Sequence, residues 1–205
     1  MYNHINKFNI MRKILIYSII MIVILTSCSA LKELISFTRC EFRIKSMESI
    51  RMAGVNLEGK SSINDFKLTD MAILMQHAIR GTLSLDVMLH IEAKNPNQQS
   101  AAINRVEWIA YIDDLEMMTG FVNEMVVIPA NNGVGIIPIH IEFDLKNVVE
   151  SSTGKAIANL ALNLMNIGER ESRFTVRIKP TILVGSFTLD YPGYINITKE
   201  FTSGN

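Results

Sequence analysis

The stretch that decides the fold is Ile91–Leu145, which reads IEAKNPNQQSAAINRVEWIAYIDDLEMMTGFVNEMVVIPANNGVGIIPIHIEFDL. Its apolar runs are separated by Asn-Pro-Asn, Asp-Asp and Asn-Asn-Gly, which are residues that start turns or tolerate a positive φ. The last run alternates strictly, with Ile137, Ile139, Ile141 and Phe143 on one face and Pro138, His140, Glu142 and Asp144 on the other. This alternation predicts a strand with one buried and one solvent-facing side, as in an antiparallel sheet.

The same signals continue on both sides of this stretch. Thr82–Ala93 and Arg173–Lys179 also alternate, and Pro180 is expected to open a further strand to about Thr188. Asp113-Asp114 and Asn131-Asn132-Gly133 are the expected tight turns, the second of them a hairpin. About seven or eight short strands predict a mainly β protein: an antiparallel β-sandwich of the fibronectin III or immunoglobulin-like type, with one or two α-helical insertions.

The first helical insertion is expected between Thr69, as its N-cap, and Gly81, with Asp70 in its first turn. Its apolar residues fall at helical spacing, at Met71, Leu74, Met75 and Ala78. We expect this face to pack into the core, because helical spacing of apolar residues is typical of a buried helix face.

A second helix is expected to start at the caps Ser151-Ser152-Thr153 and to reach about Ile167. We expect one face to be buried and the other to be exposed. The predicted inner face holds Ile157, Leu160, Ala161 and Leu164, and the predicted outer face holds Lys155, Asn159, Asn163 and Asn166.

Composition places the chain among globular proteins, since 48% of its residues are apolar and 20% are charged. Twenty basic residues balance twenty acidic ones, but Lys7, Arg12 and Lys13 lie in the first 27 residues, where there is no acid. The remainder is therefore slightly acidic, and this gives no reason to expect nucleic-acid binding, which usually needs a basic surface.

The N-terminal segment has the features of a lipoprotein signal peptide. Met11-Arg12-Lys13 is a short basic region, and the apolar run Ile14–Leu25 is too short to span a bilayer but suits a signal peptide. Leu25-Thr26-Ser27-Cys28 follows and resembles the bacterial lipobox, in which the cysteine is acylated and becomes the new N-terminus. Translation starting at Met11 in place of Met1 would give the same mature protein. We therefore predict lipidation at Cys28.

These features divide the chain into a signal peptide (1–27), a lipid-anchored tether (28–40) and a folded domain (41–200). Ser29 is not the aspartate that marks inner-membrane retention in enterobacterial lipoproteins, and no acidic run follows it. We expect a domain held in the cell envelope by its lipids, on the periplasmic face of an outer membrane. Cys40 is expected to be a small buried residue at the start of a strand.

The chain shows no pattern of reaction chemistry. It contains no G-x-S-x-G, H-E-x-x-H, P-loop or C-x-x-C motif, so we expect a protein that is not an enzyme and needs no cofactor. His90 and His140 lie among acidic residues on outward strand faces, which fits either a surface metal site or, more simply, solvated faces. We expect no metal site, and the pattern leaves any ligand-binding residues unknown. Met117-Met118 is expected to form an apolar loop tip.

Several of these segments together resemble the late embryogenesis abundant type 2 family (LEA type 2), also described as the water-stress and hypersensitive-response (WHy) domain. Its pattern is carried by Ala93-Lys94-Asn95-Pro96-Asn97, Val106–Ile112, Asp113-Asp114 with Thr119-Gly120, Ile128-Pro129-Ala130-Asn131 and Ile137-Pro138-Ile139. The Bacteroidetes-type lipoprotein branch of the family is resembled further by Cys40-Glu41-Phe42, Ile178-Lys179-Pro180 and Tyr191-Pro192-Gly193-Tyr194.

The resemblance implies a fibronectin- or immunoglobulin-like sandwich and a loose association with desiccation and stress responses. It brings no catalytic motif. The expected function is thus a membrane-anchored, non-catalytic lipoprotein in a binding or envelope-structural role, with the membrane as partner through Cys28 and no nucleic acid. The alternative is a periplasmic carrier of lipid or another apolar ligand, and the further partner is a lipid or an envelope protein.

Overall fold

The computed structural model describes residues 16–17, 37–144, 152–184 and 187–202. The strands are β1 (Glu41–Met52), β2 (Val55–Asn56), β3 (Ser84–Asn95), β4 (Ala101–Ile112), β5 (Leu115–Val122), β6 (Val126–Ile128), β7 (Gly133–Asp144), β8 (Ser172–Val184), β9 (Phe187–Asp190) and β10 (Ile195–Phe201). The helices are the 3₁₀ turn η1 (Ile63–Asp65), α2 (Leu68–Arg80) and α3 (Ser152–Leu164).

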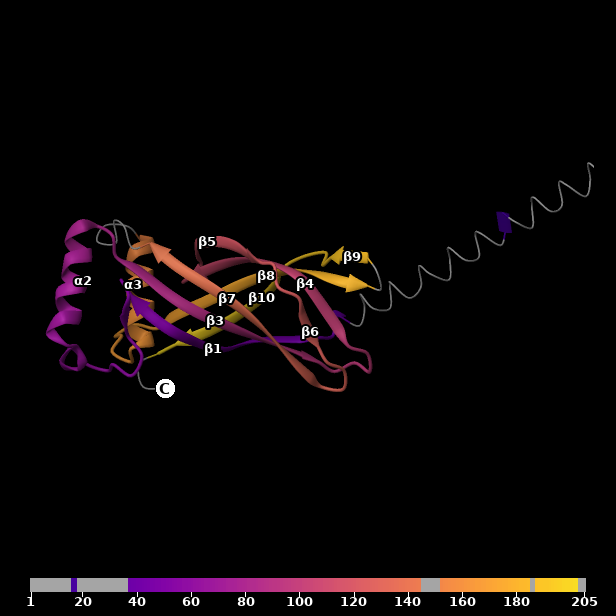
Figure 1. Ribbon diagram of the computed structural model, residues 1–205, viewed down its shortest axis with the longest axis horizontal. Coiled ribbons are helices and arrows are strands. Elements are labelled where there is room, and N and C mark those ends of the chain that lie inside the picture. The colour runs from indigo at the N-terminus through magenta and orange to yellow at the C-terminus, as the bar shows by residue number, and fades with distance from the viewer. Residues whose placement is uncertain (1–15, 18–36, 145–151, 185–186, 203–205) are drawn as a thin grey trace, which may run out of the picture.

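The strands form two antiparallel sheets. One sheet has the order β2-β1-β3-β7, and the other has the order β10-β8-β4-β5, with β6 added to β4 and β9 added to β8. Long strands run side by side along the molecule, while α2 lies across one end of it (Figure 1). The predicted mainly β sandwich with helical insertions is confirmed.

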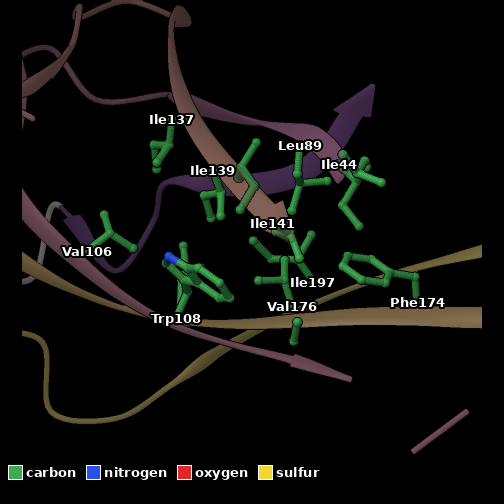
Figure 2. Close-up of a cluster of buried hydrophobic side chains, with 14 of the residues drawn as sticks. Ile44, Leu89, Val106, Trp108, Ile137, Ile139, Ile141, Phe174, Val176 and Ile197 are labelled. Carbon is green, nitrogen blue, oxygen red and sulfur yellow. The ribbon is translucent and has the colours of Figure 1, made fainter. Parts of the chain in front are cut away.

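The core fills the space between the two sheets, as Figure 2 shows for part of it. Leu89, Ile139 and Ile141 of the four-stranded sheet face side chains such as Trp108 and Val176 of the other sheet. All five are at most 5% exposed. Alternation along β3 and β7 produces this layer, because every second side chain points inward.

Both predicted turns form, with different consequences. Asp113 and Asp114 have φ angles of 51° and 65° and join Ile112 directly to its partner Leu115, so β4 and β5 make a two-residue hairpin. Asn131 and Asn132 also have positive φ angles. Their turn, however, leads from β6 in one sheet to β7 in the other, and no ladder joins these two strands. The predicted hairpin at Asn131-Asn132-Gly133 is therefore wrong.

Asn95 explains the Asn-Pro-Asn segment in structural terms. It is fully buried, and its side-chain nitrogen donates to the backbone oxygens of Gln99 and Ile128 at 2.8 and 3.2 Å. Its side-chain oxygen accepts a hydrogen bond from the backbone nitrogen of Asn97. Its backbone oxygen accepts one from the backbone nitrogen of Asn132. The residue therefore ties the β3–β4 loop to the β6–β7 turn.

Pro180 does not open a strand, as the sequence suggested, but lies inside β8. Residues before it pair with β10, up to Ile178 with Ile195, and residues after it pair with β9, from Thr181 with Asp190. A proline has no N–H to give to a ladder. It fits here because β8 changes its neighbour at this point.

The second helix packs as expected on one face but not on the other. Leu160 and Ala161 are buried, yet Asn163, predicted to be outside, is only 5% exposed. Its side-chain nitrogen donates to the backbone oxygen of Arg170 at 2.6 Å and to the hydroxyl of Ser172 at 3.0 Å. Asparagine is buried here because the end of the helix must be joined to the first residues of β8.

The first helix differs more from its prediction. Its N-cap is Lys67 and not Thr69, because the Asp70 carboxylate accepts from the backbone nitrogen of Lys67. Gly81 ends the helix in the left-handed region, as expected. No residue of α2 is buried, and Met75 is 64% exposed, so the predicted core packing of the Met71 and Met75 face is wrong.

Met117 and Met118 are a further correction. They lie within β5, not at a loop tip, and both are half-buried against the core. The β4–β5 turn is only two residues long, so the strand begins before the methionines.

Candidate binding groove

The outer face of the six-stranded sheet carries a cluster of aromatic, basic and hydroxyl side chains. Strand register places Tyr111 of β4 beside Thr175 of β8, and Thr175 beside Thr198 of β10. These outward side chains border an open groove of about 630 Å³. Its lining residues are Tyr111, Asp114, Arg173, Thr175, Arg177, Asn196, Thr198 and Glu200.

Arg177 is the central group of this groove. Its guanidinium carbon lies 5.7 Å from the ring centre of Tyr111 and 5.1 Å from that of Tyr194, so the cation sits between two aromatic rings. One terminal nitrogen donates to the Tyr111 hydroxyl at 3.3 Å. The buried Nε has no hydrogen-bond partner in the structure. The Arg177 guanidinium is therefore held by the two tyrosine rings more than by hydrogen bonds.

A hydrogen-bonded frame holds the neighbours of Arg177. The Tyr111 hydroxyl donates to the Glu116 carboxylate at 3.0 Å. The hydroxyls of Thr175 and Thr198 share a hydrogen bond of 2.9 Å across β8 and β10. At the rim, Arg173 forms an ion pair with Asp114. Every one of these groups is on a strand or a two-residue turn, so the groove has a rigid floor.

This arrangement suits a polar ligand with an anionic group. A planar guanidinium offers several fixed donors to a carboxylate, and tyrosine faces pack against rings, including those of sugars. Tyr194 is 41% exposed and is open to such stacking.

The two histidines singled out in the sequence do not come together as a site. His90 Nδ1 lies 3.3 Å from the Ser46 hydroxyl and 3.5 Å from Glu48, whereas His140 Nε2 lies 3.4 Å from Asp86. Each histidine thus has its own neighbours on the outer face of the four-stranded sheet. Within the described ranges, no three His, Cys, Asp or Glu residues are placed to hold a metal ion.

Charged pairs on the same face are solvated. A hydrogen bond from Arg43 lowers the pKa of the Glu92 carboxyl below its ordinary value, and a hydrogen bond from Ser46 does the same for the pKa of Glu48. Both shifts favour the charged form of the carboxylate.

The structure describes only one of the two cysteines. Cys28, the predicted lipidation site, lies outside the described residues. Cys40 is buried, as predicted, and burial raises the pKa of its thiol to about 11. Phe37, three residues earlier, is 2% exposed and stacks on Phe42 and Tyr191. No helix in the described part of the chain is long and apolar enough to cross a membrane.

Sequence reasoning missed the groove. Arg177 lies in the alternating run Arg173–Lys179, but Tyr111 and Tyr194 are 66 and 17 positions away from it and reach it only through strand pairing. The sole signal was a set of outward Tyr, Thr and Arg residues on three separate runs, which no local pattern connects.

Comparisons with known proteins identify no family. No protein-family model matches the sequence, and no curated protein matches it. Among solved structures, the chain is similar to the crystal structure of a protein from Archaeoglobus fulgidus, at 12% identity and a TM-score of 0.37, over 78% of this chain and 99% of that one.

Two solution structures are also similar to this chain. At1g01470 from Arabidopsis thaliana is 17% identical, with a TM-score of 0.36, over 58% of this chain and 70% of that one. At2g46140.1, assigned provisionally to the late embryogenesis abundant (LEA) proteins, is 12% identical, with a TM-score of 0.39, over 89% of this chain and 86% of that one. We draw neither family nor function from likenesses at these TM-scores.

Proposed function

We propose that this protein is a membrane-anchored, non-catalytic lipoprotein with a LEA type 2-like domain, and that it binds a polar envelope component through the groove around Arg177. The observation that carries the binding role is the guanidinium of Arg177 held between the rings of Tyr111 and Tyr194. Lipid attachment at Cys28 rests on the lipobox-like segment Leu25–Cys28.

The position of the groove supports such a role. Phe37 lies beside Val184 at the far end of β8, whereas the groove starts at Arg173 on the same strand. Eleven residues of strand separate these points by roughly 37 Å at 3.4 Å per residue. The nine steps from Cys28 to Phe37 span at most about 32 Å. A lipid at Cys28 would keep one end of the domain near the membrane and hold the groove away from it.

The ligand class follows from the groove lining. Arg177 suits a carboxylate, and the threonine hydroxyls and Asn196 suit hydroxyl groups. Tyr194, which packs on Arg177 beside the groove, offers an exposed ring face. A polysaccharide with acidic sugars has all three features. The interior of the sandwich is occupied by side chains, as in Figure 2, so the outer surface is the better supported binding place.

Binding is tested with the full-length protein in mild detergent and a glucuronate-containing oligosaccharide, with its uncharged glucose counterpart as the matched probe. Wild-type protein is expected to bind the acidic probe, and Arg177→Ala is expected to weaken that binding at least tenfold. Arg105→Ala is the control variant, because Arg105 also stacks on an aromatic ring, that of Phe121, but lies outside the groove. Equal binding by wild type and Arg177→Ala would remove the groove from the proposal.

Lipid anchoring is tested separately by mass spectrometry of the N-terminal peptide from membrane fractions. Acylated Cys28 is expected at the new N-terminus, and Cys28→Ser is expected to release the domain from the membrane. An unmodified Cys28 in the membrane fraction would contradict the anchor but would leave the groove untouched.

The stress role that the LEA type 2 resemblance implies has its own experiment. A strain that lacks the gene is expected to survive drying or osmotic shock less well than its parent. Restoring the wild-type gene is expected to repair this loss, and restoring Arg177→Ala is not. Unchanged survival of the deletion strain would separate the protein from the stress response.

A further inference from the structure

Helix α2 presents an apolar face to solvent. Leu68 is 90% exposed, Met75 64% and Ile79 81%, and Ala72 between them is exposed too. Single apolar side chains this exposed are common, but here several of them recur at helical spacing on one face of one helix. In Figure 1, α2 lies across the end of the molecule with no other element outside it.

The spacing of this face is specific to helix pairing. Leu68, Ala72, Met75 and Ile79 follow one another at intervals of four, three and four residues, which is the a/d seam of a coiled coil. The positions that flank such a seam are Thr69 and Gln76 on one side and Met71 and Ala78 on the other. None of the flanking residues is charged. Charged flanks normally select against wrong partners, so a neutral flank permits a like helix to approach.

We propose that α2 pairs with the α2 helix of a second copy of this chain, antiparallel, about a two-fold axis between residues 73 and 74. In that register Leu68 lies opposite the partner's Ile79, and Ala72 lies opposite the partner's Met75. The two-fold axis repeats both contacts. The small Ala72 and the large Met75 therefore face each other twice, once on each side of the axis. The seam is thus complementary to itself, as a two-fold interface requires.

Charge and dipole favour the same arrangement. Antiparallel helices bring the positive N-terminus of one dipole near the negative C-terminus of the other. Asp70 lies off the seam and is already near Lys60, at 3.7 Å. An anionic membrane surface fits less well, because interfacial helices are rich in Lys and Arg on their polar face, and α2 contains Arg80 alone.

The position of α2 fits a contact between two bodies. It precedes Ser84, the first residue of β3, whereas Glu41 at the start of β1 pairs with Lys94 near the other end of β3. The helix therefore lies at the end of the sandwich opposite the start of β1. Two copies joined through α2 would meet end to end, with their remaining surfaces free.

The test uses two differently tagged copies of the full-length protein, produced together, solubilised in mild detergent and purified through one tag. Wild-type copies are expected to co-purify. Ile79→Glu in both copies is expected to reduce the co-purified fraction at least tenfold, because two carboxylates would then face Leu68 side chains. Adding Leu68→Lys to Ile79→Glu is expected to restore co-purification, since each introduced lysine then faces the partner's introduced glutamate.

Controls separate pairing from other causes. Leu162→Glu places the same charge on an exposed residue of α3, 40% exposed, and is expected to leave co-purification unchanged. Far-ultraviolet circular dichroism spectra of Ile79→Glu and wild type are expected to agree, because Ile79 is 81% exposed within its own chain and its replacement leaves the fold of each copy intact. The N-terminal segment is identical in all variants, so any association through it cancels in the comparison.

Three outcomes would overturn the proposal: no co-purification of wild-type copies, no loss with Ile79→Glu, or no restoration by the double variant. In the last case, flotation with phosphatidylglycerol vesicles tests whether the exposed face of α2 binds lipid instead.

Disulfide trapping gives an independent readout. Copies with Ala72→Cys and Met75→Cys are expected to cross-link with each other faster than either with itself, and Thr119→Cys, on an exposed strand face, is expected not to cross-link.

Discussion

Helices α2 and α3 are both 13 residues long and both have an apolar face, yet they have opposite relations to the core. In α3, Leu160 is fully buried and five further residues are buried with it. In α2 no residue is buried, and the apolar face formed by Leu68, Ala72, Met75 and Ile79 is exposed. The comparison shows that helical spacing tells which residues share a face but not what that face contacts.

The two helices are also held by different means. α3 is joined to β8 by packing and by the amides of Asn159 and Asn163, which both reach Ser172. α2 is held mainly at its ends: by Lys60, whose ammonium lies 3.7 Å from the Asp70 carboxylate in the first turn, and by the left-handed Gly81. One helix is therefore part of the cooperative core, and the other is an attached element that can open on its own.

The largest expected difference comes from truncating one apolar residue in each helix. Leu160→Ala is expected to lower the free energy of unfolding by about 2–5 kcal/mol, because it leaves a cavity in a packed site. Met75→Ala is expected to change it by less than about 0.5 kcal/mol, since the side chain is exposed. Urea denaturation of both variants measures this. Equal losses would mean that α2 is part of the core.

The amides give the second contrast. Asn163→Ala is expected to destabilise the protein by about 1–3 kcal/mol, because the Arg170 carbonyl and the Ser172 hydroxyl each lose a buried partner. Gln76→Ala on the exposed side of α2 is the matched control and is expected to have almost no effect. Thermal unfolding under the same conditions compares the two. A neutral Asn163→Ala would show that water replaces the amide.

A smaller effect is expected at the end of α2. Gly81→Ala places a side chain at a φ of 64° and is expected to cost about 1 kcal/mol. We expect the cost to appear as roughly fivefold faster amide exchange in Leu68–Arg80, with an unchanged melting temperature. Amide exchange in α3 serves as the internal reference. A lowered melting temperature would instead place α2 in the global unfolding unit.

Acidification is expected to give the smallest effect. Hydrogen bonds from the backbone of Ser61 lower the pKa of the Asp65 carboxyl below its ordinary value of 3.8. The stabilisation is therefore fully present above about pH 4 and is lost as the pH falls through the lowered folded value. Amide exchange in residues 61–80 is expected to accelerate in that range, beyond the intrinsic pH dependence, and Asp65→Asn is expected to abolish the excess. A persisting excess would point to another acid.

The sequence alone predicted most of the sandwich. Alternation along β3 and β7 is strict, and the Asp113-Asp114 turn joins its strands with no spare residue, so local signals and the fold agree. Pro180 was misplaced because proline usually marks a strand end, while here β8 changes neighbours at that residue. The sequence does not reveal such a change, because the pairing partners lie far apart along the chain.

The candidate groove was out of reach for the same reason. Arg177, Tyr111 and Tyr194 come from three strands, and only the register brings their side chains together. Asn163 was misjudged differently: an amide at a helical position opposite the apolar face is usually solvated, but the loop after α3 folds back and buries it. Long-range pairing decides both cases.

Cys40 gives the molecule a built-in reporter. Its thiol is buried just before β1, and burial raises the pKa of the thiol to about 11, so it is almost fully protonated at neutral pH. An alkylating reagent therefore reacts only when this end of the domain opens, because thiolate formation needs contact with water. The labelling rate of Cys40 would therefore report how often the start of β1 detaches from β3.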